Sequence, residues 1–153
     1  MSDTQTFTSE TDTLTFLLAG NARVTFQSLK TGTRYTYRVR RAEDKGDGLT
    51  PPWFVSLLTG SDNESDYTYM GLLGATMGTQ YTALRVTRKS RYTESSAPVV
   101  AFRYVLRHLT AGAMPPNVAI SHEGRCGRCG RALTVPSSIA SGLGPECAGK
   151  MGL

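Results

Sequence analysis

Cysteine is scarce in this chain of 153 residues, and its distribution excludes a disulfide framework. Only three cysteines are present, so a disulfide would leave one thiol unpaired. Disulfides also belong mainly to secreted proteins, whereas residues 1–15 are polar and rich in Thr, without the apolar core of a signal peptide. We therefore expect reduced thiols in a cytoplasmic protein.

Long hydrophobic runs are absent as well. No segment approaches the roughly 18 consecutive apolar residues that a transmembrane helix needs, so the sequence predicts no membrane partner. Acidic residues are also few, because 12 Asp and Glu stand against 17 Lys and Arg, for a formal net charge of +5. This balance favours anionic partners.

Acidic residues are missing altogether from residues 23–42. The basic residues of this stretch are Arg23, Lys30, Arg34, Arg38, Arg40 and Arg41. Such segregation of charge indicates a surface suited to phosphates. A cationic face that is merely solvated gives the same pattern, and the sequence leaves this alternative open.

Short runs of β-branched and aromatic residues, broken by turn signals, predict an antiparallel sheet. The expected strands span residues 23–29, 33–41, 53–58, 67–73, 81–87 and 118–121. The first two strands flank the turn at Gly32 and form a hairpin.

The second of these strands separates two kinds of side chain. Because successive side chains alternate between the faces of a sheet, Tyr35 and Tyr37 share one face. Arg34, Arg38 and Arg40 share the other face. One face is therefore expected to be core and the other basic, although the two tyrosines could instead stack on bases of a single strand.

Residues 98–109 break the strand pattern and predict one main helix. Apolar residues recur there at spacings of three and four, Pro98 suits a first helical turn and Gly112 follows the end. The predicted fold class is therefore α+β, with a small antiparallel β-sheet packed with one main helix and followed by a C-terminal zinc-knuckle module.

Three parts of the chain follow from this pattern. Residues 1–13 are rich in Thr, Ser and acids with little to bury, which predicts a disordered tail. Residues 14–117 form the α+β domain, and residues 118–153 form the zinc-binding module.

All three cysteines lie in that last part, with the spacing His-x3-Cys-x2-Cys-x17-Cys from His122 to Cys147. A structural zinc ion takes four ligands from thiolate and imidazole, and Cys-x2-Cys places two sulfurs on one ion. We expect one structural Zn2+ bound by Cys126, Cys129 and Cys147, with His122 as the fourth ligand. A redox pair or unliganded thiols are the alternatives for the cysteines, and an ordinary surface or core residue is the alternative for His122.

Residues 122–147 resemble a known family. The Cys-x2-Cys knuckle, Leu-Thr-x-Pro-x-Ser-Ile and Gly-x-Gly-Pro-x-Cys occur in this order, as in the small zinc-finger module known as domain of unknown function 6011. That module occurs in bacteriophage and other mobile-element proteins. The resemblance implies the same metal ligands and a phage-type protein in the cytoplasm of a bacterial host, and it implies no activity.

These observations predict a non-catalytic accessory protein that binds DNA or RNA without sequence specificity. The expected phosphate-binding residues are Arg34, Arg38 and Arg40 of the sheet and Arg125, Arg128 and Arg131 of the finger. No nucleophile elbow, phosphate-binding loop or metal-hydrolase motif is present, so we expect no enzyme. The alternative is an inhibitor that binds a host enzyme or defence system, in the manner of an anti-CRISPR protein.

Overall fold

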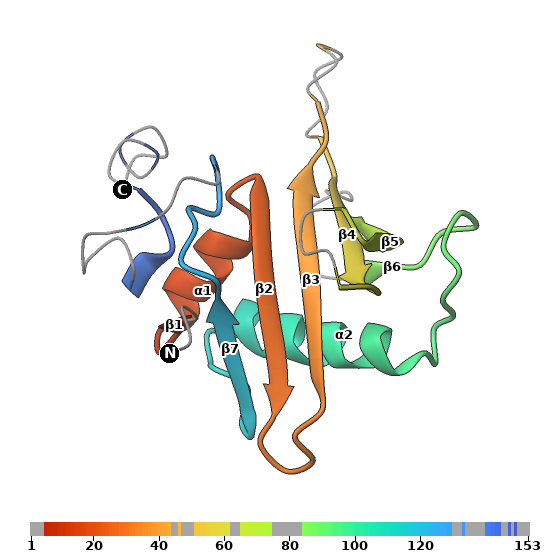
Figure 1. The fold of residues 1–153 in the computed structure, drawn as a ribbon, viewed down its shortest axis with the longest axis horizontal. Coiled ribbons are helices and arrows are strands. Elements are labelled where there is room, and N and C mark those ends of the chain that lie inside the picture. The colour runs from red at the N-terminus through yellow and green to blue at the C-terminus, as the bar shows by residue number, and fades with distance from the viewer. Residues whose placement is uncertain are drawn as a thin grey trace.

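A computed structural model describes residues 5–43, 46, 51–61, 65–74, 84–129, 133, 140–144, 147 and 149. Through these residues runs a seven-stranded antiparallel sheet with two helices (Figure 1). The elements are β1 (Gln5–Thr6), α1 (Glu10–Leu17), β2 (Asn21–Ser28), β3 (Arg34–Arg41), β4 (Trp53–Leu58), β5 (Tyr67–Leu73), β6 (Leu84–Arg85), α2 (Ala97–Thr110) and β7 (Val118–His122). The predicted α+β class is confirmed.

The strands do not lie in chain order, since the sheet reads β1-β7-β2-β3-β4-β5-β6. Strands β2 to β6 follow one another as a meander of neighbours. The chain then passes through α2 and returns as β7 beside β2, where Phe26 pairs with Ile120. The last strand of the chain thus lies inside the sheet, between β1 and β2.

Helix α2 is the main helix that the sequence predicts. Pro98 stands in its first turn, and Gly112 follows its end with a φ of 85°, a left-handed conformation that glycine adopts freely. Its buried residues recur at three- and four-residue spacings and are Val99, Phe102, Val105, Leu106 and Leu109. This stripe joins the core, because Phe102 lies 5.0 Å from Tyr37 of β3 between ring centroids.

One face of the sheet carries the core. The buried side chains of both helices form a single cluster with inward residues of the strands, so α1 and α2 cover the same face; Figure 1 shows both helices behind the sheet. Tyr37 and Val39 of β3 are buried in this cluster and Tyr35 packs against it. The predicted core position of the tyrosines is therefore confirmed.

The opposite face is here called the open face, since no helix of the described residues covers it. It consists of Thr6 of β1, Asn21, Arg23, Thr25 and Gln27 of β2, Arg34, Thr36, Arg38 and Arg40 of β3, Phe54, Ser56 and Leu58 of β4, Tyr67, Tyr69 and Leu72 of β5, Arg85 of β6, and Ala119 and Ser121 of β7. These residues follow from the alternation along each strand and from the cross-strand register.

The prediction of a disordered tail is wrong for residues 5–13. Thr6 of β1 pairs with Ser121 of β7, and the Phe7 side chain is only 3% exposed. Helix α1 then begins with Ser9 as its N-cap, whose hydroxyl accepts from the backbone N–H of Asp12. One buried phenylalanine and one cap are enough to order a polar segment once a strand from the far end of the chain lies beside it. Residues 1–4 lie outside the described residues.

The predicted boundary between the α+β domain and the zinc-binding module also needs correction. Residues 118–122 form β7, which pairs with β2 along its whole length. A boundary at residue 118 would remove a central strand from the sheet, so the cysteine segment continues directly from the core. The sequence predicts the strand at 118–121 but not its place in the sheet, because its pairing partners on β2 lie far away in the chain.

Candidate metal centre and the open face

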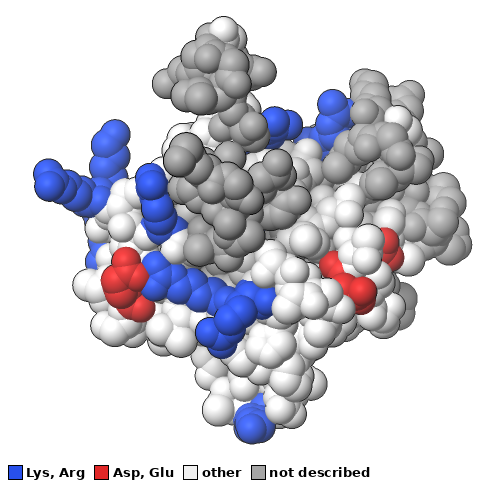
Figure 2. Space-filling model, turned by 180° about the vertical axis from the view of Figure 1, so that it is seen from behind, with Lys and Arg blue, Asp and Glu red and all other residues white. Residues whose placement is uncertain are grey.

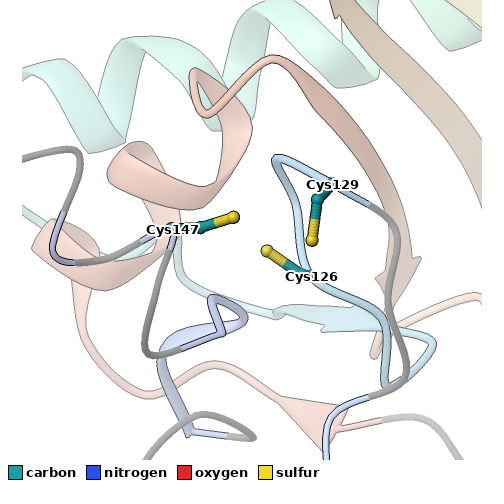
Figure 3. Close-up of side chains that lie close together, drawn as sticks. All are labelled: Cys126, Cys129 and Cys147. Atoms are coloured by element: carbon teal, nitrogen blue, oxygen red, sulfur yellow. The ribbon is translucent and has the colours of Figure 1, made fainter.

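The three cysteines converge. Cys126 and Cys129 come from the turn that follows β7, and Cys147 comes from the C-terminal segment (Figure 3). Their Sγ atoms all lie within 4.8 Å of one another, and Figure 3 shows the three thiols pointing toward a common centre. Cys126 and Cys147 are buried and Cys129 is exposed, with none of them in a disulfide. This arrangement can hold a metal ion.

The surroundings of the thiols are unequal. Burial raises the pKa of Cys147 to about 11, and the neighbouring Cys129 and Cys126 add to this through hydrogen bonds and charge. Burial also acts to raise the pKa of Cys126, but hydrogen bonds from the backbone of Gly144, Cys129 and Arg128 outweigh it and lower the pKa to about 7. Several thiolates at such distances repel one another, and a bound cation removes this repulsion.

The turn that carries Cys126 and Cys129, here called the cysteine turn, packs against Phe16 of α1 at positions where glycine leaves room for the ring. A Cβ on Gly127 would lie 2.6 Å from the ring of Phe16, so this position has no room for a side chain. The Gly127 N–H donates to the carbonyl of Gly142 at 2.8 Å, and Gly142 has a φ of 76° against the same ring. Glycine is needed at both places because the backbone approaches an aromatic ring directly.

His122 does not join the cysteine cluster. Its side chain, 2% exposed, points into the core, where its ring lies 5.1 Å from Phe7 and 5.4 Å from Phe16 between centroids. Its Nδ1 accepts a hydrogen bond from the Gly124 N–H at 3.0 Å. This bond engages the lone pair of Nδ1, and His122 is not among the residues whose ligand atoms converge. The geometry therefore speaks against the prediction of His122 as the fourth ligand.

The arginines predicted to bind phosphates fall into two groups. Arg34 and Arg40 are exposed on the open face and Arg38 is half-buried there. Arg125 and Arg128 are exposed beside the cysteine turn. Arg131 lies outside the described residues.

Asn21 joins these two groups. Its backbone N–H donates to the carbonyl of Gly127 in the cysteine turn at 2.7 Å. Its side-chain Oδ1 accepts from Nε of Arg38 at 3.3 Å, and its register partner on β3 is Arg40. The cysteine turn and the sheet arginines therefore meet at one end of the open face, a connection that sequence spacing did not indicate.

The strands carry charge of one sign. Their charged residues are Arg23, Arg34, Arg38, Arg40, Arg41 and Arg85, and no Asp or Glu occurs in any of the seven. Glu123, just after β7, pairs with Arg23 at 3.2 Å. Arg41 lies apart from the others, with its guanidinium 5.4 Å from the centre of the Trp53 ring. The remaining arginines make the open face cationic.

The side of the molecule that carries α1 and α2, here called the helix side, has charges of both signs. Figure 2 shows it with both basic and acidic side chains on the surface. Arg103 of α2 pairs with Glu94 and also donates from its guanidinium to the carbonyl of Leu84 at 2.8 and 3.1 Å. This arginine joins α2 to β6 and serves the fold.

Phe54 is an open-face residue that no motif in the sequence marks. The strand predicted at residues 53–58 is rich in apolar residues, yet Phe54 is 41% exposed while Trp53 and Val55 are buried. The alternation along β4 could have revealed this, because Phe54 is out of phase with the buried residues on both sides.

Comparison with known proteins covers the cysteine segment. Residues 119–152 match the family model described as Family of unknown function (DUF6011). The matched segment includes most of β7 and all three cysteines. No curated protein and no solved structure matches the chain. Among the described residues, neither helix has the length and apolar character that crossing a membrane requires.

Proposed function

We propose that this protein is a small phage-type accessory protein that binds DNA or RNA through the open face and the adjoining cysteine turn, without catalysis. The observation that carries the proposal is the arginine set of the open face, which has no acidic residue within the strands. Arginine binds phosphate oxygens in a planar, bidentate fashion. Such contacts give affinity for any sequence and fall with salt.

The proposed metal is a single structural zinc ion. Zinc binds thiolate at about 2.3 Å, so a tetrahedral site separates its sulfurs by about 3.8 Å, and the three Sγ atoms already lie within 4.8 Å. Backbone N–H groups that donate to Cys126 stabilise the thiolate that zinc requires, among them the N–H of Arg128 at 3.5 Å. Water or another side chain completes the shell, since His122 faces the core.

Zinc would support nucleic-acid binding indirectly, by fixing the positions of residues that bind phosphate. An ordered cysteine turn holds Asn21 by the bond to Gly127, and Asn21 in turn holds the guanidinium of Arg38. Removal of the metal should therefore weaken nucleic-acid binding even though no phosphate touches zinc.

The test replaces Arg34, Arg38 and Arg40 together by Gln. Binding to unrelated DNA and RNA sequences, followed by fluorescence anisotropy over a salt series, should weaken by a similar factor for each sequence. The slope of log affinity against log salt should become shallower by about one unit for each lost phosphate contact. The matched control is Arg107→Gln, an exposed arginine of α2, which should leave the slope unchanged.

Wild-type protein that binds neither DNA nor RNA at low salt contradicts the proposal. A host protein that is then captured from lysate, with or without nuclease treatment, would support the inhibitor of a host enzyme or defence system instead.

A further inference from the structure

Phe54 is an exposed aromatic ring on the face of the sheet that carries the arginines. The exposed large hydrophobic side chains among the described residues are Leu29, Phe54 and Val100, and only Phe54 is aromatic. Leu29 lies in the β2–β3 turn and Val100 on α2, so neither belongs to the open face. Phe54, the second residue of β4, is 41% exposed and belongs to neither hydrophobic cluster of the described residues, so part of its ring can meet a ligand.

The ring is flanked by arginines on both sides. Arg40 of β3 is the register partner of Phe54, which in turn pairs with Leu72 of β5, and Leu72 pairs with Arg85 of β6. One row across the open face therefore reads Asn21, Arg40, Phe54, Leu72, Arg85. Neighbouring strands lie about 4.8 Å apart, so the backbone positions of Arg40 and Arg85 are about 5 and 10 Å from that of Phe54 along the row, a span that the long arginine side chains can cover.

The Phe54 ring is also held in place. It meets Tyr69 in an edge-to-face contact, with 6.3 Å between centroids and an interplanar angle of 71°. Tyr69 itself is anchored, because its hydroxyl lies 2.8 Å from the hydroxyl of Thr87 in a hydrogen bond. A ring supported in this way loses little freedom when a flat ligand covers it.

We infer that the open face binds single-stranded nucleic acid, with a base stacked on Phe54 and phosphates bound by Arg40 and Arg85. This inference rests on the proposed function and names its ligand class. Unpaired bases offer a free π-face, and their phosphates lie within reach of cations beside the ring. Bases in a duplex are already stacked and paired, so a ring on an exposed sheet cannot reach them.

The experiment separates stacking from phosphate contacts. Fluorescence anisotropy compares a short oligothymidylate, the same strand in a duplex, and an abasic strand of equal length that keeps its phosphates. Wild type should bind the oligothymidylate most tightly. Phe54→Leu should weaken that binding by about 5- to 100-fold, as expected for one lost stacked base, and leave the abasic strand unaffected.

The controls are matched to the ring. Phe54→Tyr keeps an aromatic face and should restore wild-type affinity, and Leu29→Ala removes an exposed side chain from outside the open face and should change nothing. Arg40→Gln should weaken the oligothymidylate and the abasic strand alike. Equal affinity of wild type for all three nucleic acids, with no effect of Phe54→Leu, overturns the stacking inference and leaves the proposed function intact. No binding to any of them overturns both.

Discussion

The two faces of this sheet come from the same strands and differ in almost every property. Along β3, Tyr37 and Val39 are buried beneath the helices, while Arg38 and Arg40 alternate with them on the open face. The core face is closed by aromatic contacts, such as Phe26 against Tyr37 at 5.0 Å. The open face instead carries arginines, of which Arg38 donates from Nε to Oδ1 of Asn21 at 3.3 Å. The core that stabilises the fold thus lies on one side of the sheet and the proposed binding surface on the other, so substitutions should affect one without the other.

The cysteine turn is the place where the two faces are coupled. Through Gly127 it touches Phe16 on the core side, and through the same residue it accepts from Asn21 at the end of the open face. A change at the metal centre should therefore reach both faces, whereas changes elsewhere should remain on one.

The largest effect is expected for Cys147→Ser, which breaks that coupling. Loss of one thiolate leaves an incomplete shell, and structural zinc contributes its binding energy, on the order of 10 kcal/mol in small fingers, to the order of the segment that holds it. Metal analysis should find no zinc, and thermal unfolding should shift to lower temperature. Arg40→Gln serves as the open-face control with full zinc content. Equal zinc in both variants would remove Cys147 from the metal centre.

The next largest effect is expected for Phe16→Ala, which should lower the free energy of unfolding by about 3–5 kcal/mol. The ring is 1% exposed, its centroid lies 5.1 Å from that of Phe7, and it packs against Gly127 of the cysteine turn. Urea unfolding measures the loss. Phe54→Ala, the same change on the open face, should cost less than about 1 kcal/mol. Similar losses for both would mean that the two faces do not differ in packing.

His122→Ala tests whether this histidine is a core residue or a metal ligand. The buried ring packs against Phe7 and Phe16, so its removal should cost about 2–4 kcal/mol, as for other large core side chains, without changing the zinc stoichiometry. His108→Ala is the matched control, because that imidazole is only half-buried on α2 with its Nδ1 against the carbonyl of Tyr104. Zinc loss in the first variant alone would restore His122 as a ligand.

The smallest effect at neutral pH is expected for Tyr37→Phe. The buried hydroxyl donates to the carbonyl of Pro98 at 2.7 Å, a bond that contributes about 1 kcal/mol. Burial, and to a lesser degree Tyr35, raises the pKa of Tyr37 far above its ordinary value of 10.0. Its contribution is therefore complete below about pH 10 and decreases as the pH rises further, since only the unfolded chain then loses the proton. The free energy of unfolding should therefore fall between about pH 9.5 and 11 in wild type. This fall should be less steep in Tyr37→Phe than in wild type or in Arg40→Gln.

Much of this architecture follows from local sequence patterns. Alternation along residues 33–41 separates the tyrosines from the arginines, because side chains of a strand must point to opposite faces. The stripe of residues 98–109 predicts α2, whose pattern needs only the helical period. The spacing of Cys126 and Cys129 likewise predicts a shared site, since two residues between them are enough to bring both sulfurs together.

Tertiary structure decided what depends on partners far away in the chain. Phe7 is ordered because β1 pairs with β7, and β7 belongs to the sheet because it pairs with β2. The same strand places the His122 ring against Phe16 and outside the group of converging thiols, although its spacing to Cys126 suits a ligand. The row that joins Arg40, Phe54 and Arg85 is set by cross-strand register. Register is a property of paired strands, and no single segment of the sequence contains it.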